Sequence, residues 1–150
     1  MQQVTAFSIR PVRQAQRLTS VLQLLEDASL PRQGVEDGAT RLWLAEAEGR
    51  PAGAVGLEVR GGHGLLRSLV VAPGCRGQGL GGRLMDVVLE EARGLGLSHL
   101  FLLTTTAEAY FPRWGFEVVT RAQVPAALEA SEELRGACPA SAVVMRRALT

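Results

Sequence analysis

The feature that most constrains the fold is an apolar strand that leads through a glycine-rich loop into an amphipathic helix. Leu69 to Val71 form an apolar run typical of a β-strand, and Pro73 and Gly74 end it. After the loop, apolar residues recur at helical spacing, at Leu80, Leu84, Val87, Val88, Ala92 and Leu95. A helix begins with backbone N–H groups that lack intrahelical partners and with the positive end of its dipole, and glycines let an anion approach closely. The sequence therefore predicts a site for a phosphate-bearing ligand.

Gly77 to Gly82 also match the G-x-G-x-x-G pattern of dinucleotide-binding proteins, but the context does not fit. In those proteins the first glycine follows the strand almost directly, whereas residues 72–76 intervene here. The next strand candidate ends at Leu103 and Thr104 without an acidic residue for a ribose hydroxyl. A dinucleotide site is therefore the weaker interpretation of this loop.

One domain over residues 1–150 is expected, because this length supplies one sizeable core and is too short for two. The formal net charge of +1 gives no general attraction to nucleic acid or to anionic membranes. No apolar run approaches the roughly 18 residues of a membrane span. Residues 1–10 lack the apolar core of a signal peptide, so a cytoplasmic protein is expected. The two cysteines, Cys75 and Cys138, lack metal-ligand spacing and are expected to be free thiols.

The pattern before the loop predicts one helix and a meander of strands. The expected elements are a strand over 6–10, a helix over 12–28, a loop over 29–40, and strands over 41–47, 52–60 and 65–71. The last three strands follow one another through short turns, so they should pair antiparallel. A dinucleotide-binding domain does not begin with such a meander.

The pattern after the loop predicts a crossover helix, followed by strands and short helical segments. The expected elements are a helix to about Arg93 that ends at a left-handed Gly94, a strand over 98–104, a short helix over 107–111 interrupted at Pro112, a strand over 116–119, a helical segment over 124–134 and a strand over 141–147. A strand reached through a crossover helix pairs in parallel with the strand before it. The expected fold class is α/β, with a mixed, mostly antiparallel central sheet, one parallel pair and helices on both faces.

Two segments carry a resemblance to a known family. Written as Arg76-x-x-Gly79-x-Gly81 after an apolar strand, the loop closely resembles the acetyl-CoA pyrophosphate loop of the GNAT N-acetyltransferases. Residues 102–116, which end in Gly-Phe, are similar to the second signature of that family and to the acetyltransferase domain of N-acetylglutamate synthases. The tail over 121–145 resembles small acetyltransferases associated with arsenic-resistance operons. The resemblance implies a GNAT fold, acetyl-CoA as the cofactor, and a small-molecule amine as the acceptor, either an amino acid or an arsenic-containing one.

The resemblance also implies roles for individual residues. It implies direct attack of a neutral amine on the thioester, without an acyl-enzyme. The cofactor-binding residues that it implies are Leu69, Val70, Val71, Arg76, Gly77, Gln78, Gly79, Leu80, Gly81, Gly82, Thr104 and Phe111. Glu58 is the candidate base, acting through water, and a solvated strand residue is the competing interpretation. Phe111 occupies a position where many members of the family have a tyrosine acid, so this role passes to Tyr110, to solvent or to no group at all. Tyr110 is the candidate acid, and core packing is its other interpretation.

Three residues are candidates for contact with the acceptor. Arg67 and Ser68 flank the expected meeting point of the acetyl group and the amine, where Arg67 would pair with an acceptor carboxylate or cap the sheet surface. Cys138 is expected to pack or to line the acceptor pocket. Because no tyrosine acid stands at the usual position, a catalytically silent CoA-binding or regulatory module is the alternative function.

The oligomeric state is predicted from the last strand. Residues 142–145 are four apolar or small residues in succession, and an apolar edge strand left unpaired is a liability for a soluble protein. The sequence therefore predicts a homodimer.

Overall fold

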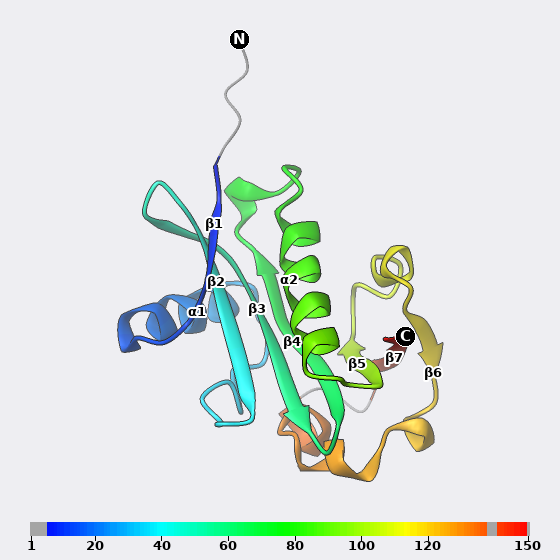
Figure 1. The fold of residues 1–150 in the computed structure, drawn as a ribbon. Helices are drawn as coiled ribbons and strands as arrows, with labels where there is room; N and C mark the ends of the chain where they lie inside the picture. The colour runs from blue at the N-terminus through cyan, green and yellow to red at the C-terminus, as the bar shows by residue number, and fades with distance from the viewer. Residues whose placement is uncertain (1–5, 138–140, 150) are drawn as a thin grey trace.

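The computed structural model describes residues 6–137 and 141–149, which form an open sheet of seven strands with helices on both faces (Figure 1). The strands are β1 (Ser8–Pro11), β2 (Thr40–Ala47), β3 (Arg50–Arg60), β4 (His63–Val71), β5 (His99–Thr104), β6 (Glu117–Val119) and β7 (Val143–Ala148). Their order in the sheet is β1-β2-β3-β4-β5-β7-β6, and among the described residues every neighbouring pair is antiparallel except β4 and β5. The predicted fold class is therefore confirmed.

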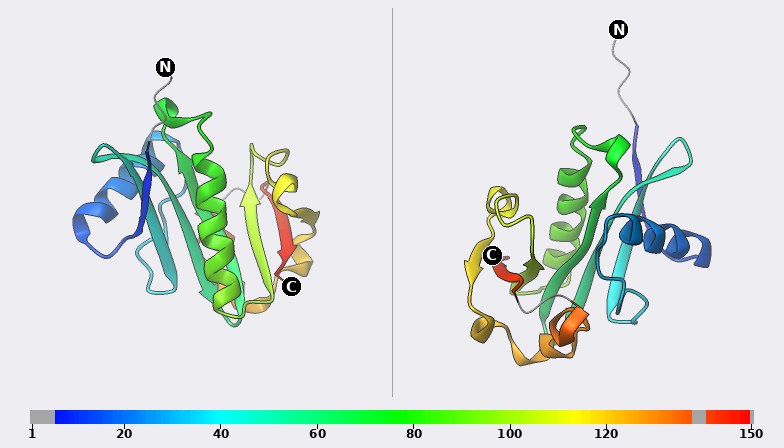
Figure 2. Two further views of the ribbon diagram at one scale, coloured as in Figure 1. Left: turned by 45° about the horizontal axis from the view of Figure 1, so that its top comes forward. Right: turned by 180° about the vertical axis from the view of Figure 1, so that it is seen from behind.

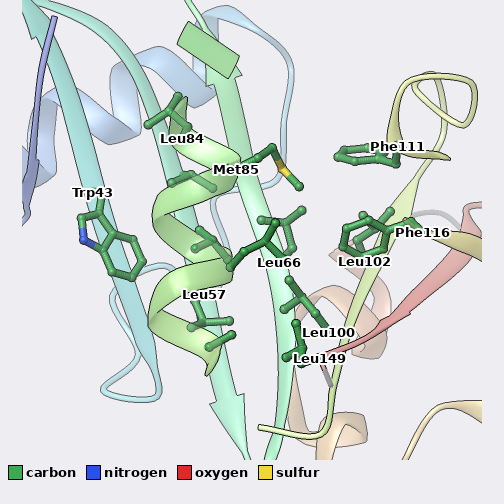
Figure 3. Packing of buried hydrophobic residues seen from close by; sticks show 14 of the residues in the cluster. Trp43, Leu57, Leu66, Leu84, Met85, Leu100, Leu102, Phe111, Phe116 and Leu149 are labelled. Atoms are coloured by element: carbon green, nitrogen blue, oxygen red, sulfur yellow. The ribbon is translucent and has the colours of Figure 1, made fainter. Parts of the chain in front are cut away.

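Two α-helices, α1 (Ala15–Asp27) and α2 (Leu80–Gly94), cover opposite faces of the sheet (Figures 1 and 2). Because side chains alternate along a strand, Leu42 and Leu44 of β2 join the apolar cluster under α1, whereas Trp43 joins the cluster under α2. Figure 3 shows this second cluster, which includes Met85 and Leu66. The two clusters fix the central strands from both sides.

Both helices differ slightly from the predicted bounds. α1 begins at Ala15 rather than at residue 12, because the Val12 amide still donates to the Leu42 carbonyl and continues the pairing of β1. α2 includes Gly94, and the left-handed residue is Gly96, with a φ of +72°. The amide of Gly96 bonds to the carbonyl of Arg93, and the next amide bonds to that of Ala92, which is a Schellman ending.

Two segments expected to be α-helical are shorter helical turns. The chain turns over residues 108–110 and forms a 3₁₀ turn, η2 (Phe111–Trp114), so Pro112 lies at the start of a helical turn and interrupts none. Proline fits there because the amide it lacks would have no partner. The segment expected over 124–134 is divided between η4 (Ala126–Ala130) and η5 (Glu133–Ala137). Two further 3₁₀ turns are η1 (Pro73–Cys75) and η3 (Arg121–Gln123).

The last strand is interior. β7 pairs with β5 along its whole length and with β6 on its other side. The premise of the homodimer prediction, an unpaired apolar edge, is therefore wrong, because the three-residue β6 takes the edge position. The homodimer stays a prediction without that support.

Candidate active site

The glycine-rich loop opens α2 as predicted. Gly77 and Gly79 both have a φ of +79°, and Gly79 is the N-cap residue of the helix. A side chain would be strained at either position, since L-residues rarely adopt this backbone conformation. The first amides of α2 have no intrahelical acceptors, and no acidic side chain occupies the first turn. The start of α2 therefore presents N–H donors and a positive dipole end to an anion.

A cavity of about 500 Å³, which we name the loop cavity, lies against this helix start. Its second wall consists of Tyr110, Arg113 and Trp114 from the segment before β6. The predicted cofactor-binding residues that line it are Leu69, Val71, Arg76, Gly77, Gly79, Leu80, Gly81 and Gly82. Four other predicted residues, Val70, Gln78, Thr104 and Phe111, do not line it. Val70 is instead buried in the cluster under α1.

β4 departs from regular pairing where it approaches this cavity. Ser68 has a φ of +61°, and the register with β3 shifts so that Ser68 and Leu69 together oppose Val55. This arrangement is a β-bulge, which bends a strand. On the other side, β4 pairs with β5 only at Gly64 and Leu65. The two parallel strands consequently separate toward their carboxyl ends (Figure 2, left).

A second cavity, of about 610 Å³, occupies the separation of β4 and β5, and we name it the wedge cavity. Five predicted site residues line it, Arg67, Ser68, Leu69, Thr104 and Phe111. Its remaining walls come from residues 29–33, residues 102–107, Glu133 and Ala142. Leu69 lines both cavities, whereas the adjacent Tyr110 and Phe111 line different ones. The anion site and the second cavity thus share Leu69, a residue of the β4 bulge.

Arg67, which lines the wedge cavity, forms a buried ion pair with Glu58. The Nη1 atom of Arg67 lies 3.1 Å from Oε1 of Glu58, and both side chains are at most 1% exposed. The other nitrogens of Arg67 bond to the Gln33 carbonyl and to Oγ of Ser68, and its Nε lies 3.5 Å from Oε2 of Glu133. Arg67 is therefore bound by the protein on every side of its guanidinium.

The carboxylate of Glu58 is likewise occupied by hydrogen bonds within the protein. It accepts hydrogen bonds from Nε of Arg60 at 2.6 Å and from Oγ of Ser131 at 2.8 Å, in addition to the Arg67 contact. Glu58 lines neither the loop cavity nor the wedge cavity. Three protein donors therefore occupy its carboxylate oxygens. This arrangement favours a positioning role for Glu58 over proton transfer.

The ion pairs continue to the surface through Arg60. Its Nη2 atom lies 2.9 Å from Oδ2 of Asp37, which is exposed. The backbone amide of Ala39 and the Arg60 guanidinium hold the pKa of the Asp37 carboxyl below its usual value of 3.8. The hydrogen bond to Glu58 raises the pKa of Arg60 above its usual range. Asp37 and Arg60 are therefore both charged at neutral pH.

Sequence reasoning missed the residues that complete the wedge cavity. Gln33 comes from the loop after α1, and Glu133 comes from η5. Ser131, between η4 and η5, does not line the cavity but donates a hydrogen bond to Glu58. The amide of Glu133 donates to Oγ of Ser131, which holds the segment against Glu58. No spacing or motif in these irregular segments indicates such contacts. The candidate Cys138 lies outside the described residues.

The described part of the chain shows neither a metal-binding cluster nor a membrane-spanning helix. Its His, Cys, Asp and Glu side chains nowhere gather in a group of three that could hold a metal ion. None of the helices within residues 6–137 and 141–149 has the length and apolar character that crossing a membrane requires.

Comparison with known proteins gives a family match over most of the chain. Residues 8–116 match the model described as the acetyltransferase (GNAT) family. A relative named amino-acid acetyltransferase, from Neisseria meningitidis, is 28% identical over 96 residues, which are 63% of this chain and 22% of that protein. The chain thus spans about a fifth of the length of this curated relative.

Solved structures show the same fold. N-acetylglutamate synthase from Neisseria gonorrhoeae, complexed with coenzyme A and N-acetyl-glutamate, superposes with a TM-score of 0.78 at 22% identity, over 99% of this chain and 36% of that one. Rv2747 from Mycobacterium tuberculosis, in complex with CoA and NLQ, gives a TM-score of 0.75 at 22% identity, over 95% and 99% of the two chains.

Proposed function

The chain belongs to the acetyltransferase (GNAT) family, and from this premise we propose that it transfers the acetyl group of acetyl-CoA to the amine of a small amino acid. The observation that carries the proposal is the junction of the two cavities at Leu69. An anion site at a helix start suits the phosphates of the cofactor. The wedge cavity, which shares Leu69 with the loop cavity, suits the thioester and the acceptor.

The cofactor is proposed to bind along β4 and the loop. The pyrophosphate would accept hydrogen bonds from the amides at the start of α2, and main-chain groups of Leu69 and Val71 would bind the pantetheine arm. Thr104 and Phe111 line the wedge cavity, where they would contact the acetyl end. Phe111 has no proton to give, so we propose that the thiolate of CoA leaves without a side-chain acid.

A small amino acid suits this site on energetic grounds. The amine must be neutral to attack the thioester carbonyl, and its lone pair forms the new C–N bond while the C–S bond breaks. Holding an α-amino group of pKa about 8 neutral at pH 7 costs about 1.4 kcal/mol, against about 4.6 kcal/mol for a lysine-like amine of pKa about 10.4. An α-amine therefore needs little help from a base, which agrees with the engagement of Glu58 by two arginines.

The charges that line the wedge cavity support a zwitterionic acceptor. Arg67 is bound by the protein in a buried site, so we propose that Arg32 pairs with the acceptor carboxylate instead. Arg32 is exposed, and its own ion pair with Glu26, at 3.7 Å, is exposed as well. Glu133 lines the same cavity while it pairs with Arg67, and its negative charge would attract the ammonium form before the amine loses its proton. The name of the Neisseria relative and the N-acetyl-glutamate in the gonococcal structure support an amino acid. An arsenic-containing amino acid is a further candidate.

A CoA-release assay tests the proposal. The panel contains the common amino acids, glutamate and glutamine among them, an amino-acid arsenical, a polyamine, an aminoglycoside and a lysine peptide. We expect CoA release with at least one amino acid and none with the polyamine or the aminoglycoside. Binding of acetyl-CoA without release across the whole panel would instead support the silent CoA-binding module.

A further inference from the structure

We infer that Tyr110 and Arg113 form a second phosphate-binding wall of the loop cavity, opposite the start of α2, and that they bind the pyrophosphate of the cofactor. The inference deepens the proposed function and rests on it. It assigns Tyr110 to cofactor binding, a role distinct from proton transfer and from core packing.

Glycine is required in the loop for its backbone angles and at the start of α2 for lack of space. Gly77 and Gly79 adopt left-handed backbone angles, and a Cβ atom at either would meet open space. Gly81 is helical, yet a Cβ atom there would lie 2.8 Å from the hydroxyl oxygen of Tyr110. Gly82 is also helical, and its Cβ would lie 3.1 Å from the Trp114 ring. The first turn of α2 therefore has no side chains where the Tyr110 segment approaches it.

This close approach places a hydroxyl beside unpaired amides. Gly81 lies in the first turn of α2, where the amides have no intrahelical acceptors. In the part of the chain that the structure describes, the Tyr110 hydroxyl has no hydrogen-bond partner, although its ring packs edge-on against Phe111 with centroids 5.2 Å apart. A phosphate oxygen bound at this turn would meet backbone N–H donors on one side and the hydroxyl on the other.

Arg113 adds positive charge to the same wall. Its guanidinium carbon lies 4.6 Å from the centroid of the Tyr110 ring, a cation–π arrangement that keeps the side chain at the cavity. No carboxylate lies within ion-pair distance of Arg113 among residues 6–137 and 141–149. The other cation of the cavity, Arg76, uses its Nε to bond the Val71 carbonyl at 3.3 Å. Arg113 is thus a side chain, on the wall opposite Arg76, that can match the charge of a phosphate.

The choice of pyrophosphate follows from the position of Tyr110. Its hydroxyl lies over the first turn of α2, and the helix dipole and free amides favour anions at that turn. Tyr110 does not line the wedge cavity, in which the thioester is proposed to react. The hydroxyl is therefore suited to the phosphate end of the cofactor.

Calorimetric titration of the wild type and three variants with CoA and with dephospho-CoA tests this inference. We expect Arg113→Ala to raise the dissociation constant about tenfold for both ligands, as loss of one charge-assisted contact would. Tyr110→Phe, which keeps the ring, should raise it about threefold to tenfold. Arg93→Ala removes an exposed arginine from the far end of α2 and should leave both constants within twofold.

Each outcome is decisive. Unchanged affinities in Arg113→Ala and Tyr110→Phe, with the wild type binding CoA, would overturn the inference and leave the proposed function standing. A loss for CoA but not for dephospho-CoA would assign Arg113 to the 3′-phosphate and would also overturn it. A wild type that binds neither ligand would overturn the proposed function itself. If the loss of affinity in Arg113→Ala becomes smaller as the salt concentration is raised, the result would support an ionic contact by Arg113.

Discussion

Arg67→Met should lower the free energy of unfolding by about 3–5 kcal/mol, as removal of one partner from a buried ion pair does. The substitution keeps an apolar stem of similar length but leaves the carboxylate of Glu58 without one of its two guanidiniums at a site that is 1% exposed. It also removes the contacts of Arg67 with Gln33 and Glu133, which hold two irregular segments on the sheet. Urea denaturation measures the change.

The control is Arg41→Met. Arg41 pairs with Glu91 at 2.8 Å, but the two side chains are 50% and 34% exposed. An exposed pair contributes about 0–1 kcal/mol, so this variant should unfold close to the wild type. Equal effects of the two substitutions would contradict the structural role of Arg67. A rise in the Michaelis constant of an amino acid with unchanged stability would restore Arg67 as a partner of the acceptor carboxylate.

Gly79→Val should weaken acetyl-CoA binding by about a hundredfold or more. A β-branched residue at a φ of +79° is a steric outlier, so the loop must relax and move the N-cap of α2. Two or three hydrogen bonds to a charged phosphate, each contributing about 1.5–3 kcal/mol, would be lost or misaligned. Calorimetric titration measures the affinity, and thermal unfolding checks that the domain stays folded.

Gly74→Val is the matched control for this loop. Gly74 lies outside the left-handed region, and a Cβ atom there meets nothing within 4 Å. This variant should bind acetyl-CoA within a few-fold of the wild type. If both variants bound equally well, the backbone of Gly79 would not form the phosphate site.

The parts of the site that the sequence predicts are those with local signals. The loop is predictable because the left-handed backbone angles of Gly77 and Gly79 favour glycine. The helix is predictable because apolar residues recur at helical spacing from Leu80 onward. Both signals lie within a few residues of one another. The bulge at Ser68 has no such signal, since it arises from how β4 meets two neighbours with different registers.

The parts that the sequence did not predict depend on contacts between distant segments. Glu58 is polar at a strand position typical of a solvated residue, but Ser131, 73 residues further on, buries it. The position of β7 is also non-local, because an apolar strand pattern fits an edge and an interior position equally well. The role of Tyr110 is also non-local, because it depends on the approach of its hydroxyl to Gly81 in the first turn of α2.

The central claim is that the loop between β4 and α2 is an acetyl-CoA site. Calorimetric titration of the wild-type chain with acetyl-CoA and, separately, with NAD tests it most directly. The account predicts saturable binding of acetyl-CoA at one site per chain and no measurable binding of NAD at the same concentrations. Binding of NAD with no binding of acetyl-CoA would contradict the account and would make the loop a dinucleotide site.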